Sequence, residues 1–105
     1  MPLPDTFAAL GNDVRFAIVE RLLHEGELAA GELADPSMSA PAMSHHFRVL
    51  REAGILSQRI DAQRRLYSVR PEAMKAIGQW SLTYREFWEQ SLDRLARTIE
   101  REKRK

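Results

Sequence analysis

The sequence contains no cysteine, which excludes disulfides, thiolate metal sites and cysteine nucleophiles together. It also lacks any apolar run near the roughly 20 residues that a membrane-spanning helix needs, so we expect no contact with a membrane. Its first residues show neither the basic stretch nor the long apolar stretch of an export signal, so we expect a cytoplasmic protein. With 105 residues, 44% of them hydrophobic and 30% charged, the chain has the size and composition of one globular domain.

The net charge of +1 conceals an uneven distribution along the chain. Residues 1–39 carry two basic and seven acidic side chains, whereas residues 40–70 carry six arginines and only two acidic side chains. A nucleic-acid surface needs such a local positive potential rather than a high overall pI. The alternative, that these arginines only solvate a helix and a hairpin, stays open at this point.

Capping residues and helix breakers predict five helices and one β-hairpin. Asn12 and Ser39 are good N-caps, Gly11, Gly26 and Gly54 are stops, and Pro36 ends the segment before it. The helices are predicted over residues 5–10, 13–24, 27–34, about 40–53, and from Pro71 to near the C-terminus, with extended chain over 56–69 around a polar turn.

This order of elements predicts a mainly α fold with a small β-hairpin, the winged helix-turn-helix. We expect about five helices and a two-stranded wing. The whole of residues 1–105 is predicted to form a single domain. Its DNA-binding core would span about 12–70, while the N-terminal helix and residues 71–105 would serve dimerisation.

The helix over 40–53 has a buried side and an outward side. At about 100° per residue, Met43, Phe47, Leu50 and Ala53 share the buried side, and His46 lies at its margin as a packed, hydrogen-bonded histidine. Serine and histidine can bond base edges, small apolar residues can contact a thymine methyl, and arginine can reach guanine or phosphate. The outward, DNA-facing residues are predicted to be Ser39, Ala40, Pro41, Ser44, His45 and Arg48. A merely solvated polar face is the alternative.

Three arginines surround the tip of the predicted hairpin: Arg59, Arg64 and Arg65. Guanidinium groups stay charged and donate paired hydrogen bonds, which suits contact with phosphates. We expect these residues to position the protein on DNA without specifying sequence, and at least one of them to serve only solubility or a local ion pair.

The last helix carries an apolar stripe rich in aromatic residues, which favours an interface between two copies of the chain. The predicted dimer-interface residues are Trp80, Tyr84, Phe87, Trp88, Leu92, Leu95 and Ile99, with Phe7 and Leu10 from the N-terminal helix. Two alternatives stay open. The stripe would pack within its own subunit, or Trp80, Tyr84 and Trp88 would line a pocket for a small organic effector.

From about Thr6 onward the chain resembles the arsenic-repressor-type (ArsR) family of transcription factors. The matching segments are FAALGNDVRFAIVERLL, GELAAGELA, MSAPAMSHHFRVLREAGIL and RRLYSV. The resemblance implies a dimeric, operator-binding regulator, usually a repressor. It also implies that the fourth helix enters the DNA major groove and that the hairpin is the wing.

The chain departs from this family at the metal sites and at the wing turn. Ala29 and Gly31 stand in the thiolate places of the third helix, and residues 71–105 contain no histidine to bind zinc. We therefore expect neither a metal nor another cofactor. The wing turn lacks the glycine common in the family, so Ala62 or Gln63 must accept its backbone geometry.

The leading prediction is a sequence-specific regulator that binds double-stranded DNA as a homodimer. The alternative is a winged helix kept as a protein-interaction module without DNA binding. An enzyme using Ser44 with His45 or His46 is disfavoured, because neighbouring side chains on one helix diverge and no carboxylate or glycine-rich cradle completes a catalytic site. We expect no catalytic residues.

Overall fold

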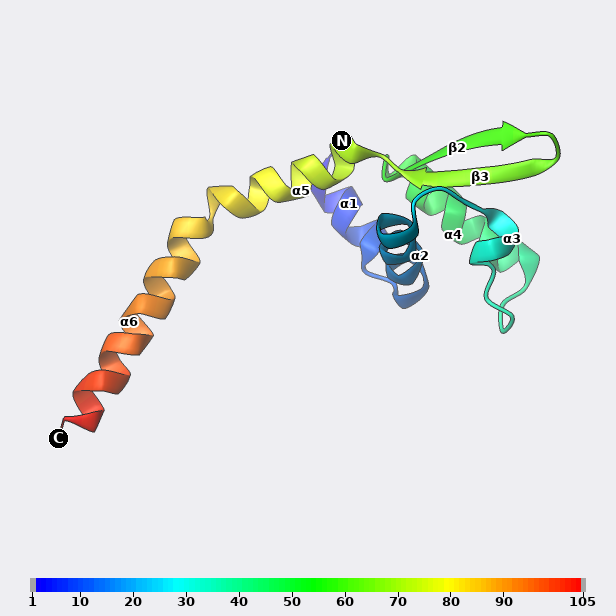
Figure 1. Ribbon diagram of the computed structural model, residues 1–105. Coiled ribbons are helices and arrows are strands. Elements are labelled where there is room, and N and C mark those ends of the chain that lie inside the picture. The colour runs from blue at the N-terminus through cyan, green and yellow to red at the C-terminus, as the bar shows by residue number, and fades with distance from the viewer. Residues whose placement is uncertain (1, 105) are drawn as a thin grey trace. The chain divides into compact units, whose positions relative to one another are not determined.

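A computed structural model describes residues 2–104 and is mainly helical with a small β-sheet (Figure 1). The elements within these residues are α1 (Leu3–Leu10), α2 (Asp13–Glu25), β1 (Leu28–Ala29), α3 (Ala30–Leu33), α4 (Ala40–Glu52), β2 (Leu56–Asp61), β3 (Arg64–Val69), α5 (Pro71–Thr83) and α6 (Arg85–Lys103). The predicted fold class, a winged helix-turn-helix, is confirmed. The chain forms two compact units, one up to Lys75 and one from Ala76 onward, and each is described by itself.

The core of the first unit joins α1, α2 and α4 to the sheet. Leu50 and Ile55 are completely buried, and the ring of Phe47 in α4 stacks on Tyr67 in β3 with centroids 4.4 Å apart. The Asn12 side chain caps α2 as predicted, because its oxygen accepts hydrogen bonds from the backbone N–H groups of Val14 and Arg15 at 3.0 and 3.1 Å. This core fixes the sheet and α4 to one another.

Helix α4 begins and packs as its sequence predicts. The Ser39 hydroxyl accepts from the Ala42 N–H at 3.3 Å, and Pro41 occupies the first turn, where a missing N–H breaks no intrahelical bond. Met43, Phe47 and Leu50 are buried, and Ala53, just past the helix, is half-buried. Gly54 follows with a φ of +77°, so the chain turns sharply into the sheet.

The prediction of a helix over residues 27–34 is wrong in its first half. Leu28 and Ala29 form strand β1, which pairs antiparallel with Tyr67 and Leu66 of β3, and only Ala30–Leu33 are helical. The predicted two-stranded wing is present as β2 and β3, and β1 adds an unpredicted third strand, so that the order in the sheet is β1-β3-β2. Pairing with β1 satisfies backbone groups along one edge of β3, a tertiary gain that outweighs the local helical preference.

The wing turn takes the strained geometry that its missing glycine implies. Asp61 pairs with Arg64, so only Ala62 and Gln63 connect β2 to β3. Ala62 has a φ of +56°, in the left-handed region that disfavours residues with a Cβ. The prediction that Ala62 or Gln63 would accept this conformation is confirmed at Ala62.

The prediction of a single helix from Pro71 onward is wrong, because this part of the chain divides into α5 and α6 at Tyr84. The Tyr84 N–H donates to the Ser81 carbonyl at 3.1 Å, three residues back rather than the four of an α-helix, so the turn is tighter. The Tyr84 ψ of 11° also lies outside the helical region. The Thr83 hydroxyl donates to the Gln79 carbonyl at 2.9 Å, a side-chain bond of the kind that bends helices.

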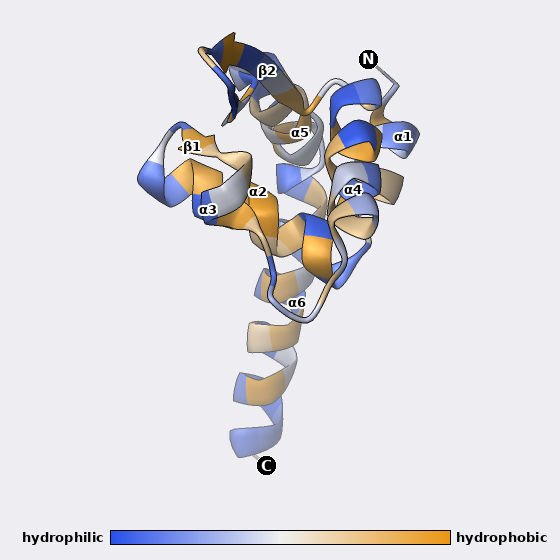
Figure 2. Cartoon of the chain, turned by 90° about the vertical axis from the view of Figure 1, so that its right-hand side faces the viewer, coloured by the Kyte–Doolittle hydropathy of each residue, from blue (hydrophilic) through white to orange (hydrophobic). Residues whose placement is uncertain are grey.

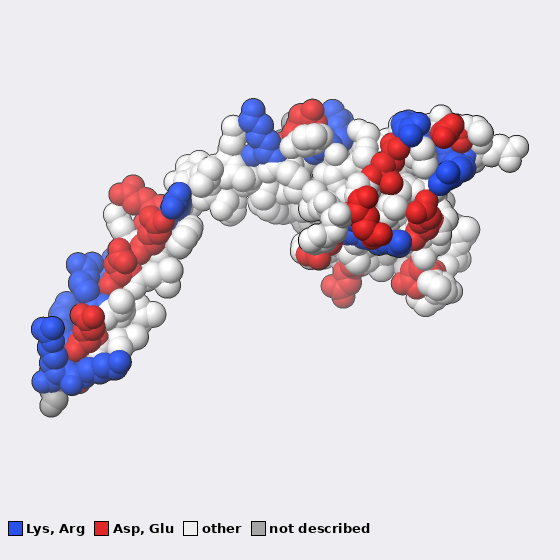
Figure 3. Space-filling view, viewed as in Figure 1, with Lys and Arg blue, Asp and Glu red and all other residues white. Residues whose placement is uncertain are grey.

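Within the second unit, helix α6 is amphipathic but buries none of its residues. Trp88, Leu92, Leu95 and Ile99 lie within about 60° of one another around the helix axis, at about 100° per residue. Hydrophobic residues recur along α6 in Figure 2, and Figure 3 shows charged residues along one of its sides and an uncharged side beside them. The four apolar side chains form one stripe, which we call the α6 stripe.

Candidate nucleic-acid interface

The outward face of α4 gathers the residues predicted to contact DNA. Ser44, His45 and Arg48 are all exposed, and Arg48 Nη2 lies 3.4 Å from His45 Nδ1. Since arginine can only donate, His45 accepts through Nδ1 in this contact, which leaves its other ring nitrogen as the donor in the neutral ring. Ser39, Ala40 and Pro41 are exposed at the start of the same helix. All six side chains are therefore free of the core.

His46 belongs to the core side of α4, as predicted. It is half-buried, and Arg15 Nη1 donates to its Nδ1 at 3.2 Å while Arg15 Nε donates to the Ala9 carbonyl at 2.6 Å. Arg15 thus connects α1, α2 and α4. Burial lowers the pKa of His46 below its usual 6.5, and the charges of Arg15 and His45 lower it further. The neutral form is the one that accepts from Arg15.

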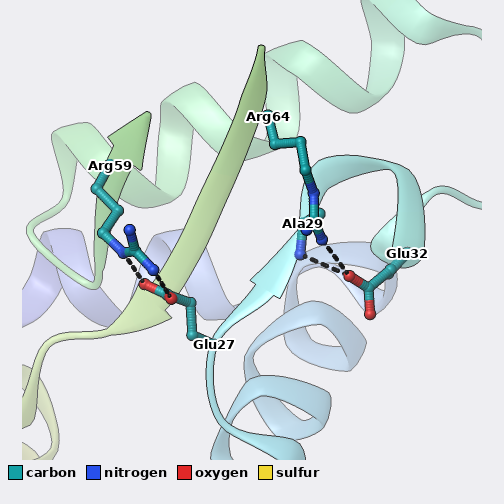
Figure 4. Close-up of polar contacts among 5 residues, drawn as sticks. All are labelled: Glu27, Ala29, Glu32, Arg59 and Arg64. Carbon is teal, nitrogen blue, oxygen red and sulfur yellow. Dashed lines mark hydrogen bonds and ion pairs between the residues drawn. The ribbon is translucent and has the colours of Figure 1, made fainter. Parts of the chain in front are cut away.

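The wing arginines differ in what they contact. Arg59 donates from Nε and Nη2 to the two carboxylate oxygens of Glu27 at 2.8 and 2.6 Å, and Arg64 Nη2 lies 3.2 Å from Glu32 Oε1 (Figure 4). Arg65 is exposed and forms no ion pair with any residue in 2–104. Arg59 and Arg64 therefore form local ion pairs. That such a pair is the whole role of at least one wing arginine stays a prediction.

Sequence reasoning missed the two glutamates that hold the wing arginines. Glu32 Oε1 also accepts from the Ala29 N–H at 3.3 Å, so this carboxylate connects α3, β1 and the wing. The hydrogen bond from Arg59 lowers the pKa of the Glu27 carboxyl, and Glu27 in turn raises the pKa of Arg59. The available signal was the acidic excess of residues 1–39 beside the arginine excess of 40–70. Figure 3 shows both signs of charge side by side in this region.

Most of the predicted dimer-interface residues have exposed side chains. They are Phe7 in α1 and Trp80, Tyr84, Phe87, Trp88, Leu92, Leu95 and Ile99 in α5 and α6 or between them. Leu10 is the exception, because it is half-buried and packs against the core. The rings of Trp80 and Tyr84 contact each other with centroids 5.5 Å apart. Exposed apolar side chains of this size are typical of surfaces that associate with other molecules.

Within residues 2–104, no three histidine, aspartate or glutamate side chains come close enough together to hold a metal ion. None of the helices in this part of the chain combines the length and the apolar composition that crossing a bilayer requires.

Known proteins resemble this chain over nearly its whole length. A helix-turn-helix domain family matches residues 10–59. The HTH-type transcriptional regulator Rv2034 of Mycobacterium tuberculosis is 40% identical over 101 residues, which cover 94% of this chain and 91% of that protein. The transcriptional repressor SdpR of Bacillus subtilis is 28% identical and covers 76% of this chain and 89% of its own length. A crystal structure of an ArsR family transcriptional regulator superposes with a TM-score of 0.74 at 28% identity, covering 83% of this chain and 90% of that one.

Proposed function

This chain belongs to the ArsR family of winged helix-turn-helix transcriptional regulators, and we propose that it acts as a homodimeric repressor that binds a specific operator. It is a regulator of transcription rather than an enzyme. The observation that carries the proposal is the exposed polar face of α4, where Ser44, His45 and Arg48 stand clear of the core.

In the proposed complex, α4 lies in the major groove and reads the bases. Ser44 and His45 supply hydrogen bonds to base edges, and Arg48 reaches a guanine or a phosphate. Ala40 and Pro41 are small enough to lie against a thymine methyl, and Ser39 sits at the helix N-terminus, where backbone N–H groups favour a phosphate. The N-terminal half of a recognition helix is the part that contacts bases in this class of fold.

The wing supplies contacts to the DNA backbone in this proposal. Arg59, Arg64 and Arg65 surround its tip, and we propose that at least one of them reaches phosphate, since Arg59 and Arg64 are each paired with a glutamate. Such contacts position a protein on DNA and make its affinity depend on salt, because each neutralised phosphate releases counterions.

The dimer forms through the terminal helices in this proposal. The α6 stripe, together with Trp80, Tyr84 and Phe87, offers an exposed aromatic and aliphatic surface. We include Phe7 and Leu10 of α1 in the proposed interface. Two α4 helices in such a dimer read half-sites about one DNA turn, ~34 Å, apart. As a second role for these aromatic residues, we propose that Trp80, Tyr84 and Trp88 bind a small organic effector.

Repression and a cytoplasmic location complete the proposal. SdpR, a relative that covers 76% of this chain, is named a transcriptional repressor. A bacterial repressor of this kind acts where the chromosome lies, and bound operator excludes other proteins from the same DNA.

Selection of bound sites from a pool of random duplexes, using purified protein, tests the proposal. We expect an enriched inverted repeat whose half-sites lie about ten base pairs apart from centre to centre. The Ser44→Ala variant should lose enrichment at one position of each half-site while it keeps the spacing. A pool that shows no enrichment with the unaltered protein would favour a winged helix that binds protein rather than DNA.

A further inference from the structure

The register of the hairpin divides the wing side chains between two faces. Residues directly opposite one another in an antiparallel pair point to the same face, and successive residues alternate. Arg59 pairs with Leu66 and Asp61 pairs with Arg64, so Arg59 and Arg64 share one face. Ile60 pairs with Arg65, so Arg65 belongs to the other face.

The face that carries Arg65 is the one turned toward α4. Tyr67 follows Arg65 by two positions and therefore lies on the same face of β3. Its ring stacks on Phe47 of α4 at 4.4 Å, so this face of the sheet packs against α4. Nearer the tip, Ile60 is 68% exposed, which shows that protein no longer covers the face where Arg65 lies. Arg65 therefore stands on an open continuation of the α4 side of the molecule.

The opposite face is occupied by carboxylates of this same chain. The Arg59–Glu27 pair reaches across β3 from β2 to the residue before β1, and Leu66 on that face is only 7% exposed. Arg64 reaches Glu32 on α3 (Figure 4). Both arginines thus connect the hairpin to β1 and α3. A phosphate would have to replace a carboxylate to bind the two donors that Arg59 gives to Glu27, whereas Arg64 is held through Nη2 alone.

Resting on the DNA-binding role proposed above, we propose that Arg65 is the wing residue that binds DNA phosphate, whereas Arg59 and Arg64 are positioning residues that hold the wing against β1 and α3. DNA that lies against α4 meets the wing face that continues the α4 side. The two-point Arg59–Glu27 pair fixes a planar guanidinium in one orientation, away from that side. One of the three wing arginines therefore contacts DNA, and the other two orient the wing.

A salt series with a short random-sequence duplex tests this division, because phosphate contacts do not depend on the operator. Arg65→Gln should flatten the slope of log affinity against log salt by about one for each protomer, and weaken binding about tenfold per protomer near 0.1 M salt. Arg59→Gln and Arg64→Gln should keep the slope of the unaltered protein. The assignment is overturned if Arg65→Gln keeps that slope while either of the other two flattens it.

Charge reversal separates positioning from phosphate contact at Arg59. Arg59→Glu alone places two carboxylates together, so we expect a lower Tm and weaker DNA binding. Adding Glu27→Arg restores an ion pair, and we expect both Tm and DNA affinity to return to within about twofold of the unaltered protein. If Tm returns and affinity does not, Arg59 binds phosphate and the inference is wrong. If the unaltered protein itself shows no salt-dependent binding, the proposed function fails as well.

Discussion

The two units of the chain treat their hydrophobic residues in opposite ways. In the first unit, Leu50 and Ile55 are completely buried, and the aromatic rings of Phe47 and Tyr67 stack inside the core. In the second unit, α6 buries no residue, and Trp88 and Leu92 remain 47% and 57% exposed. The first unit therefore buries its large apolar side chains within one subunit. The α6 stripe leaves the same residue types exposed, and it is the surface that the proposed dimer would bury.

Leu50→Ala should produce the largest change, because it empties a position with no exposed surface. We expect the free energy of unfolding to fall by about 2 to 5 kcal/mol, since the lost side chain leaves a cavity in the core. Urea unfolding followed by circular dichroism measures this loss. Leu82→Ala in α5, where the side chain is 63% exposed, is the control and should stay within about 0.5 kcal/mol. Equal losses at both positions would end the contrast between the two units.

Trp88→Glu should break the proposed association of the second unit. A charge in the centre of an apolar interface should weaken the dimer by about 2 kcal/mol or more, which is about thirtyfold in Kd. Sedimentation equilibrium measures the change. Gln90→Glu adds the same carboxylate about 200° around α6 from Trp88 and should leave the dimer intact. An unaffected dimer in Trp88→Glu would remove the stripe from the interface.

His45→Ala sharpens the contrast within the first unit between reading bases and holding phosphates. We expect a loss of about 1 to 3 kcal/mol on the selected operator and little loss on random DNA, because base contacts carry the sequence information. Fluorescence anisotropy with both duplexes measures the two affinities. Similar losses on the two duplexes would show that His45 contacts the backbone instead.

The smallest expected effect is the pH dependence of the first unit through His46. Its pKa in the folded protein is lowered from 6.5, so the unfolded chain binds a proton at a higher pH than the folded one does. The contribution to stability is therefore present above pH 6.5 and is lost as the pH falls below it. We expect the Tm to drop between about pH 7.5 and about pH 5.5, and His46→Gln to reduce that drop. A drop of unchanged size in His46→Gln would assign it to other groups.

Local signals in the sequence were sufficient for α4 and its outward face. Ser39, Pro41 and Gly54 mark the ends of the helix, and the spacing of Met43, Phe47 and Leu50 gives its buried side. These residues act within one or two helical turns of each other, so composition and spacing predict them. The predicted recognition helix and the observed one differ by a single residue at the C-terminal end.

Strand β1 and the ion pairs of the wing depend on contacts that spacing cannot reveal. Leu28 is part of a strand because it pairs with Tyr67 of β3. Glu27 and Arg59 form an ion pair although they are 32 positions apart in the sequence. The division at Tyr84 depends on a few hydrogen bonds around Thr83 in a segment with good helical periodicity. Each of these features arises from tertiary pairing or from local competition for backbone groups, which a periodic pattern does not encode.

The most direct test of the account is the affinity of the purified protein for its selected operator and for random DNA across a range of salt concentrations. With about three phosphates contacted by each protomer of a dimer, the slope of log affinity against log salt should be near −5 on the operator. The operator should be preferred at least about a thousandfold at physiological salt. A flat salt response with equal affinity for both duplexes would contradict a sequence-reading helix and a phosphate-binding wing alike.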